Sequence, residues 1–158
     1  MTTVERLTPD DWQELREVRL AALADAPLAF ASTYAREAAF DEAQWRAWLA
    51  GCGWWVARDA EGRAVGVVAL IREGPREDHV VGMWVAPQER GSATAAALLD
   101  TAVAAVRPEA EAVVLWVADG NPRARRFYER AGFTGTGERQ PLPSAPQIGE
   151  EKLRLRLR

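Results

Sequence analysis

The sequence is poor in the residues that bind metals or form disulfides. It contains a single cysteine, Cys52, and a single histidine, His79. One thiol cannot form a disulfide within the chain, and one cysteine with one histidine cannot supply the ligands of a Cys/His zinc site. We therefore expect no metal site, and any catalysis should be metal-free or should depend on carboxylates.

An excess of positive charge is also missing. The formal net charge is −3, and Lys152 is the only lysine among 20 basic residues. Proteins that bind nucleic acids usually present a strongly basic face to the phosphate backbone. The composition therefore argues against a nucleic-acid partner.

Long apolar runs are absent as well. No stretch is long enough to span a membrane, and the first six residues lack the basic flank and apolar core of a secretory signal. Hydrophobic residues make up 48% and charged residues 27% of the 158 residues, which is typical of one globular domain. We expect residues 1–158 to form a single domain of a cytoplasmic protein that has no membrane partner.

Seven short segments have the composition of β-strands, being apolar or β-branched and bounded by turn residues. They lie at residues 2–7, 54–59, 64–71, 79–85, 112–117, 134–139 and 152–158. The turn residues 60–63 predict a hairpin, and Gly82 predicts a β-bulge inside its strand. The continuous apolar run 112–117 is typical of a buried parallel strand. The proline-rich segment 141–146 is expected to form a surface loop.

Four helices are expected among these strands. The first begins after Thr8 and carries apolar residues at spacings of three and four as far as Ala22. The second has a capping box formed by Asp41 and Gln44 and a stop signal at Gly51.

The third helix covers residues 94–106. The fourth has Asn121 as its N-cap, Pro122 in its first position and Gly132 just beyond its end. Strands and helices that alternate in this way predict an α/β fold, with a mixed sheet and helices on both faces.

The turn before the third helix is suited to bind an anion. Gly91, Ser92 and Ala93 are small enough to let a ligand approach the backbone. The N–H groups in the first turn of a helix lack partners within the helix, and the helix dipole adds partial positive charge. Small residues also open ordinary helices, so a plain helix start remains the alternative for this turn by itself.

A second motif changes the interpretation of the first. Residues 115–133 contain the pattern Asn-x-x-Ala-x-x-x-Tyr-x-x-x-Gly-Phe, carried by Asn121, Ala124, Tyr128, Gly132 and Phe133. The first segment contains the pattern Gln-x-x-Gly-x-Ala, carried by Gln88, Gly91 and Ala93. This pair of motifs, in this order and spacing, resembles the GNAT superfamily of acyl-CoA-dependent N-acyltransferases, and the resemblance extends over nearly the whole chain.

The resemblance implies a mixed, mostly antiparallel sheet of about seven strands, with helices on both faces and a splayed strand pair that holds acyl-CoA. It implies acetyl-CoA as the co-substrate. The residues that it assigns to acetyl-CoA are Met83, Trp84, Val85, Gln88, Arg90, Gly91, Ser92, Ala93, Thr94, Ala95, Asn121 and Tyr128. Ala95 occupies a position where glycine is common in the family. This departure concerns the fine geometry of the turn more than the binding of acetyl-CoA.

The resemblance also gives Tyr128 the role of the catalytic acid that protonates the departing thiolate. A phenol has an ordinary pKa of about 10, close to that of a thiol, so a proton passes between them without a large mismatch. The alternative is that Tyr128 packs beside Phe127 on an amphipathic helix.

The general base and the acceptor pocket are less defined. Candidates for the base are carboxylates and the histidine near the cofactor strand or between the first two helices, with water as the alternative: Glu37, Glu73, Glu77, Asp78 and His79. Aromatic residues on the splayed strands and on a covering loop are candidates for the acceptor pocket: Phe30, Tyr34, Trp84 and Trp116. Aromatic walls suit an amine with an apolar or cationic body.

Together these features predict an N-acetyltransferase that transfers an acetyl group from acetyl-CoA directly to a primary amine of a small molecule or peptide. The alternative is a catalytically inactive CoA-binding or sensor module with the same fold. The identity of the amine, the acyl chain preference and the oligomeric state stay open, and a homodimer is one of the alternatives.

Overall fold

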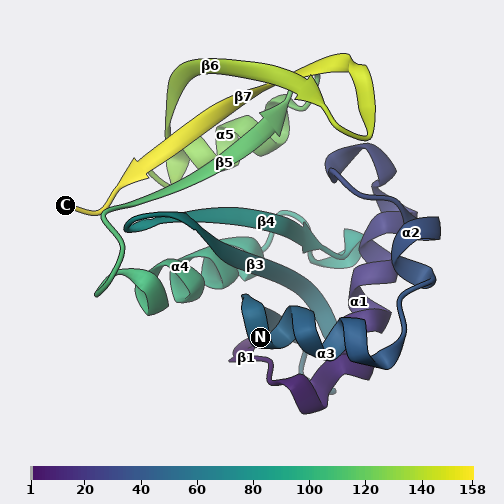
Figure 1. Cartoon of the computed structure of the whole chain (residues 1–158). Helices are drawn as coiled ribbons and strands as arrows, with labels where there is room; N and C mark the ends of the chain where they lie inside the picture. Colours follow the sequence, from purple (N-terminus) through teal and green to yellow (C-terminus); the bar gives the residue numbers. More distant parts are fainter. Residues whose placement is uncertain (1) are drawn as a thin grey trace.

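A seven-stranded mixed sheet forms the centre of the computed structural model, which describes residues 2–158 (Figure 1). The strand order is β1-β2-β3-β4-β5-β7-β6. The strands are β1 (Thr3–Arg6), β2 (Gly53–Arg58), β3 (Ala64–Gly74), β4 (Glu77–Val85), β5 (Ala112–Ala118), β6 (Thr134–Leu142) and β7 (Ala145–Arg156). Only β4 and β5 are parallel; the other neighbours are antiparallel. The predicted mixed, mostly antiparallel sheet is confirmed.

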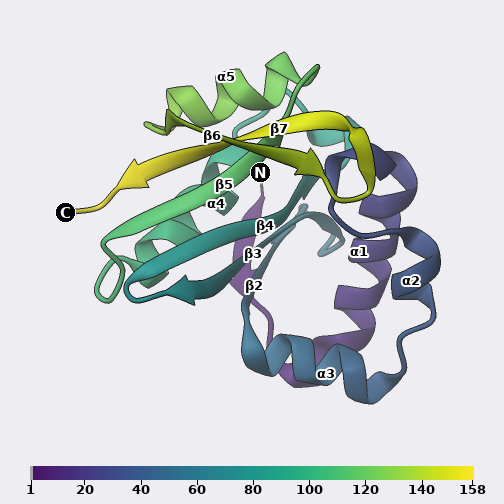
Figure 2. The same cartoon turned by 45° about the horizontal axis from the view of Figure 1, so that its top comes forward.

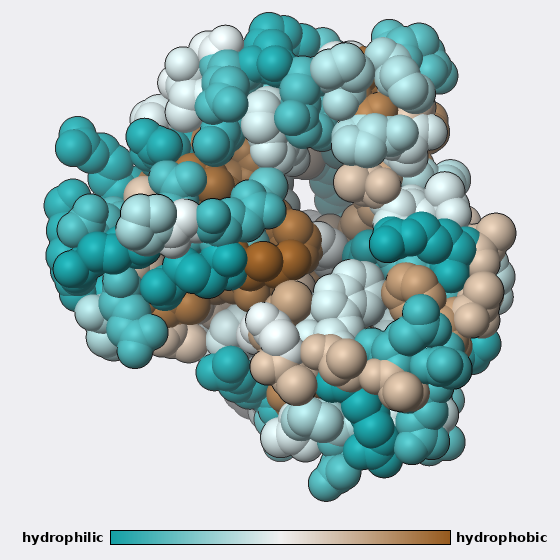
Figure 3. All heavy atoms as spheres, in the orientation of Figure 1, coloured by the Kyte–Doolittle hydropathy of each residue, from teal (hydrophilic) through white to brown (hydrophobic). Residues whose placement is uncertain are grey.

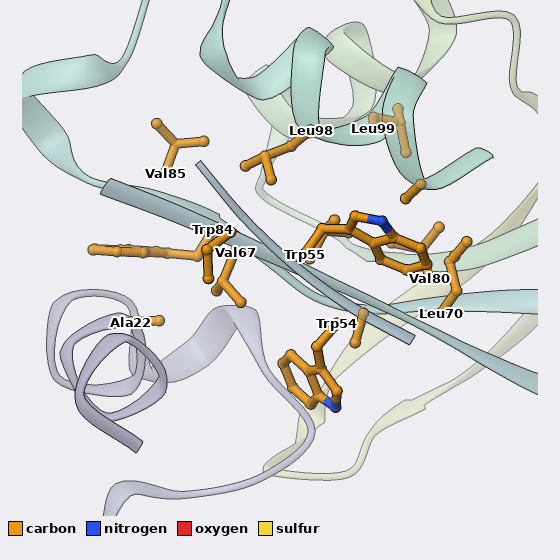
Figure 4. Close-up of a cluster of buried hydrophobic side chains, with 14 of the residues drawn as sticks. Ala22, Trp54, Trp55, Val67, Leu70, Val80, Trp84, Val85, Leu98 and Leu99 are labelled. Carbon is orange, nitrogen blue, oxygen red and sulfur yellow. The ribbon is translucent and has the colours of Figure 1, made fainter. Parts of the chain in front are cut away.

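Helices cover both faces of this sheet. They are α1 (Trp12–Asp25), α2 (Tyr34–Ala38), α3 (Glu42–Gly51), α4 (Thr94–Val106) and α5 (Pro122–Arg130). Figure 4 places Ala22 of α1 on one side of the strands and Leu98 and Leu99 of α4 on the other. Neighbouring Trp54 and Trp55 of β2 are buried on opposite sides, because successive side chains of a strand alternate between its faces. The short helix α2 was not predicted.

Local capping interactions determine where several helices begin. The Asp41 carboxylate accepts a hydrogen bond of 2.8 Å from the Gln44 N–H, and the Gln44 side chain accepts one of 2.8 Å from the Asp41 N–H. Asn121 Oδ1 accepts a hydrogen bond of 3.2 Å from the Ala124 N–H, with Pro122 at the first helical position. The predicted capping box and N-cap are therefore confirmed.

Strands β4 and β5 share only a short parallel ladder. Their register runs from Glu77 opposite Ala112 to His79 opposite Val114. Beyond His79, β4 continues beside β3, and Gly82 lies in a register shift with a φ of +68°. A bulge of this kind bends a strand and ends regular pairing on one side. The two strands consequently diverge towards their C-terminal ends (Figure 2), which confirms the predicted bulge and splayed pair.

The proline-rich segment differs from the prediction. It does not form a separate surface loop, because β6 extends to Leu142 and β7 begins at Ala145. Pro141 lies in β6, an edge strand, where a residue without an N–H does not interrupt a ladder on both sides. The Ser144 hydroxyl in the hairpin turn donates a 2.7 Å hydrogen bond to the carbonyl of Phe30. The hairpin therefore reaches the segment between α1 and α2.

Aromatic side chains join α3 to the sheet. The ring centroids of Phe40 and Trp45 lie 5.4 Å apart, and those of Trp48 and Trp54 lie 4.9 Å apart, both in edge-to-face geometry. Trp45 and Trp54 are fully buried. Among residues 2–158, no helix has the length and the apolar character needed to cross a membrane.

The capping box of α3 gives a stability prediction. Asp41→Ala removes the acceptor of the Gln44 N–H, so the free energy of unfolding should fall by about 1 kcal/mol. Urea unfolding followed by tryptophan fluorescence measures this change. The control is Glu17→Ala on the exposed side of α1, for which we expect a change within about 0.5 kcal/mol. Equal losses in the two variants would contradict the capping contribution.

Candidate active site

One cavity, which we call the turn-side cavity, lies at the N-terminus of α4. It has a volume of about 710 Å³ and is bounded by the C-terminal half of β4, the turn before α4, and α5. The predicted cofactor residues that line it are Met83, Trp84, Val85, Arg90, Gly91, Ser92, Ala95, Asn121 and Tyr128. Gln88, Ala93 and Thr94 are not among its lining residues. The Thr94 side chain is buried, and its hydroxyl donates a 3.2 Å hydrogen bond to the Glu89 carboxylate.

Three of the seven backbone amides of residues 90–96 are engaged by the chain itself. The amides of Arg90 and Ser92 donate to the carbonyls of Pro87 and Glu89, and the amide of Thr94 donates to the Ser92 hydroxyl. Within the described chain, the amides without a partner are those of Gly91, Ala93, Ala95 and Ala96. The turn therefore presents several unsatisfied N–H groups beside the cavity, which is the donor set that an anionic group requires.

Asp25, the last residue of α1, ties this turn to the first helix. Its carboxylate accepts a 2.9 Å hydrogen bond from the Trp84 indole and pairs with the Arg90 guanidinium. The hydrogen bonds from Trp84 and then Arg90 lower the pKa of Asp25, because they stabilise its charged form. Arg90 also donates to the carbonyl of Val85, over 3.2 Å. The side chains of Trp84 and Arg90 are thus held in place on the turn side of the sheet.

A second cavity, which we call the α1–α2-side cavity, lies on the other side of the diverging strands. It has a volume of about 610 Å³ and is lined by residues of α1, the α1–α2 segment, β3, β4, β5 and the β6–β7 hairpin. Figure 3 shows a hollow near the centre of this face, with apolar residues along one side. Phe30 and Trp116 line this cavity, as predicted for acceptor residues; Trp84 lines only the turn-side cavity, and Tyr34 lines neither and is 50% exposed.

The two cavities meet at three residues. Ala29, Met83 and Tyr128 line both of them. Met83 directly follows the bulge residue Gly82 in β4, and Tyr128 belongs to α5, the helix that follows β5 in the chain. A molecule that extends through the opening between β4 and β5 would therefore pass Met83 and Tyr128.

Tyr128 is buried at this junction. Its ring lies 5.2 Å from that of Phe127 and 5.7 Å from that of Phe133, both in edge-to-face geometry. Burial raises the pKa of the Tyr128 phenol well above its ordinary value, because a phenolate would lose its hydration. Tyr128 is therefore a neutral phenol at physiological pH. Its packing with Phe127, the alternative from the sequence, is also present.

A buried ion pair at the α1–α2-side cavity was not predicted. Arg19 of α1 donates from Nε and Nη2 to the two carboxylate oxygens of Glu37 in α2, over 2.7 and 3.0 Å. Its guanidinium lies 4.7 Å from the ring centre of Phe30 and 5.5 Å from that of Trp48. The only sequence signal for this arrangement is an arginine on the apolar face of α1, four residues after buried Leu15.

Three of the five predicted candidates for a base line the α1–α2-side cavity. Glu37, Glu73 and His79 line the α1–α2-side cavity. His79 Nδ1 lies 2.8 Å from Glu73 Oε2. Glu77 and Asp78 do not line that cavity; Asp78 is buried and receives two hydrogen bonds of 3.0 Å from Arg72.

The arginines at the start of α5 also take different places. Arg123 lines the turn-side cavity, together with Arg130 from the end of the helix. Arg125 instead donates a 2.7 Å hydrogen bond to Glu151 of β7. The carboxylates of Asp25, Glu89 and Asp100 balance these cations around the same cavity.

The mixed sheet, its diverging parallel pair and a helix N-terminus at the opening together define a GNAT fold. The chain belongs to the acetyltransferase (GNAT) family, whose model matches residues 12–133. Curated relatives include an uncharacterized N-acetyltransferase of Mycobacterium tuberculosis and one of Mycobacterium bovis, each 36% identical over 81 residues. The match covers 50% of this chain and 51% of each relative, so the chain spans about half the length of these relatives.

Solved structures share the fold over the whole chain. The structure of yncA from Salmonella typhimurium with its cofactor acetyl-CoA has a TM-score of 0.78 at 18% identity, covering 100% of this chain and 95% of that one. Spermidine N-acetyltransferase from Vibrio cholerae, in complex with CoA and spermine, has a TM-score of 0.75 at 16% identity, covering 99% and 95%. An acetyltransferase of the GNAT family from Streptococcus pneumoniae has a TM-score of 0.79 at 14% identity, covering 98% of both chains. At these identities the likeness concerns the fold.

Gly91 gives a test of the turn with a matched control. Its φ is +84° and a Cβ there would meet nothing within 4 Å, and the same is true of Gly62, with a φ of +82°, in the β2–β3 turn. Gly91→Glu and Gly62→Glu should therefore cost similar backbone strain. Only Gly91→Glu places a carboxylate beside the unsatisfied amides, so only this variant should lose stabilisation by acetyl-CoA.

Thermal unfolding with and without acetyl-CoA measures this effect. A ligand that binds only the folded protein stabilises it by about 2.7 kcal/mol at a hundredfold excess over its Kd. We expect that stabilisation in the unchanged protein and in Gly62→Glu. A normal shift in Gly91→Glu would place the binding site elsewhere.

The burial of Tyr128 gives a prediction for alkaline titration. The chain has two tyrosines, and Tyr34 is half-exposed. Tyr128 should ionise only at a pH well above the ordinary range of a tyrosine. Once the pH exceeds the pKa that this tyrosine has in the unfolded chain, the unfolded chain releases the proton while the folded chain keeps it, so the free energy of unfolding falls. Phenolate absorbance should contain a late phase at high pH that Tyr128→Phe removes; a titration curve that Tyr128→Phe leaves unchanged at high pH would contradict the prediction.

Proposed function

We propose that the protein is an N-acetyltransferase that transfers the acetyl group of acetyl-CoA to a primary amine by direct attack. The observation that carries this proposal is the meeting of the two cavities at Met83 and Tyr128, in the opening between β4 and β5. The turn-side cavity accommodates the co-substrate and the α1–α2-side cavity accommodates the amine. We further propose that residues 1–158 act as one catalytic unit.

The turn-side cavity has the donors that acetyl-CoA needs. The diphosphate accepts hydrogen bonds from the unsatisfied amides of Gly91, Ala95 and Ala96, which line this cavity. Pantetheine lies along the part of β4 that is no longer paired with β5. There the backbone of Met83–Val85 is available to the amide groups of pantetheine. We assign the binding of the remaining phosphate to Arg123 and Arg130, because both line this cavity.

The remaining predicted cofactor residues shape this binding site. The Ser92 hydroxyl accepts from the Thr94 amide, and Thr94 is buried behind the turn. Asn121 caps α5 through its side chain and lines the cavity at the same time. Gln88 and Ala93 do not line the cavity. Their contribution is to the backbone conformation of the turn before α4.

The reaction joins an amine nitrogen to the thioester carbonyl carbon and breaks the carbon–sulfur bond. The amine loses a proton, and the departing thiolate takes a proton from the Tyr128 hydroxyl. Burial keeps Tyr128 protonated until the thiolate forms beside it, but the raised pKa also makes this phenol a weaker acid than the pKa match to a thiol suggested. The phenolate recovers its proton from solvent after the products leave.

His79 and Glu73 are our proposal for the base. In the neutral tautomer of His79 that donates from Nδ1 to the Glu73 carboxylate, Nε2 accepts a proton from the amine, directly or through a water. Glu37 is a weaker candidate because Arg19 already holds both of its carboxylate oxygens.

Tyr128→Phe tests the acid. The substitution should lower the rate of acetyl transfer by about 10²–10⁴ and change the Kd for acetyl-CoA by no more than about threefold, because it removes the proton donor but keeps the ring. The assay is thiol release with a panel of amines, and binding is measured by calorimetry. Tyr34→Phe, the other tyrosine, is the control and should react normally. Normal turnover of Tyr128→Phe would contradict its role, and an unchanged protein that binds acetyl-CoA without transferring acetyl to any amine would favour a binding or sensor module.

A further inference from the structure

The α1–α2-side cavity has an excess of hydrogen-bond donors. Arg19 has five N–H groups, of which Glu37 accepts two. Arg19 Nη1 has no partner within the part of the chain that the structure describes, and the Arg19 side chain is 6% exposed. A buried N–H without an acceptor is unfavourable, so a donor of this kind in a cavity wall indicates that an acceptor comes from outside the chain.

The surroundings fix the position of this donor beside the cavity. Glu37 holds the opposite edge of the guanidinium, and Phe30 and Trp48 lie against its faces. Nη1 lies against Gly82, where an added Cβ would come within 2.7 Å of it. Gly82 and Arg19 both line the cavity. Glycine at the bulge of β4 therefore lets Nη1 lie close to the backbone, which a side chain at position 82 would prevent.

Each carboxylate of the cavity is engaged by a donor of the chain. Arg19 donates to Glu37, His79 to Glu73, and the Gln140 amide to Glu150 over 2.6 Å. A polyamine acceptor would compete with these donors for all three carboxylates. The cationic side chains that line the cavity are Arg19, Arg36 and Lys152, which balance the three carboxylates. A neutral cavity with a spare arginine donor suits a zwitterion better than a polycation.

We propose that the acceptor is an amino acid or a related amine that carries a carboxylate, and that this carboxylate binds Arg19 Nη1. The inference rests on the proposed acetyltransferase function and names its substrate class. Arg19 acts as the specificity-determining residue, and Glu37 fixes its orientation. The amino group of the same molecule then faces Met83 and Tyr128, where the two cavities meet.

The experiment compares matched acceptors. Thiol release from acetyl-CoA is measured with the twenty common amino acids, their carboxamides, and spermidine. Each rate is calculated for the concentration of the unprotonated amine at the pH of the assay. At least one amino acid should exceed its carboxamide in kcat/KM by about tenfold or more, because the site is built to bind the charged group. Carboxamides or spermidine that react as well as the best amino acid would overturn the inference and leave the acetyltransferase function intact.

Variants assign the preference to Arg19. Removing Arg19 alone would leave Glu37 buried without a partner, so the informative variant is Arg19→Gln with Glu37→Gln. It should raise KM for the preferred amino acid by about tenfold or more and reduce the preference over the carboxamide, with KM for acetyl-CoA within about threefold. The control is Arg58→Gln with Glu14→Gln, a second arginine–carboxylate pair between α1 and the sheet that lines neither cavity. This control should retain the preference.

The remaining outcomes are also decisive. A folded double variant that keeps the full preference for the amino acid would show that Arg19 has only a structural role. A protein that acetyl-CoA stabilises, but that transfers acetyl to no amino acid, would overturn the substrate class. A protein that acetyl-CoA does not stabilise would overturn the proposed function itself.

Discussion

The early end of the β4–β5 ladder is the constraint on which the arrangement of the molecule depends. Two parallel strands that stayed paired to their ends would close the sheet and bury the edge of β4. Here pairing stops at His79 and Val114, and the bulge at Gly82 follows. The sheet can stay together nevertheless, because β3 continues beside β4 and β7 continues beside β5. The opening is therefore part of a stable sheet.

The two sides of this opening offer donors of different kinds. On the turn side, the donors are backbone amides at a helix start, whose positions are set by the path of the chain. On the α1–α2 side, the donor is a side chain, Arg19, whose position depends on a carboxylate and on aromatic rings. A family can therefore keep one co-substrate while its acceptors vary, because the second set of contacts changes by substitution alone.

Much of the fold could be predicted because its signals are local. A capping box, an N-cap with proline behind it, and a glycine inside a strand each act through residues that are neighbours in sequence. The turn at Gly91 and the junction residue Tyr128 were found from a family resemblance, which the family match confirms. Their roles in binding and catalysis are the subject of the experiments above.

What could not be predicted depends on contacts between distant residues. The Pro141–Ser144 region has the composition of a loop, but its pairing with β7 and the contact with Phe30 make it a hairpin. The Arg19–Glu37 pair joins two helices that are packed together only in the folded chain. Trp84 was expected near the acceptor, but its indole donates to the carboxylate of Asp25, which is 59 residues away in the sequence.

The order of the strands also has a consequence for how the chain folds. Strands β2, β3 and β4 follow one another along the sequence and the sheet, and so do β6 and β7 as a hairpin. Most of the ladder length is thus closed by short loops, which lose little chain entropy on closing. The contacts of β1 with β2, of β4 with β5 and of β5 with β7 are the exceptions, because helices or a strand lie between these strands in the sequence. We therefore expect the two locally connected parts of the sheet to assemble more rapidly than the contacts that join them.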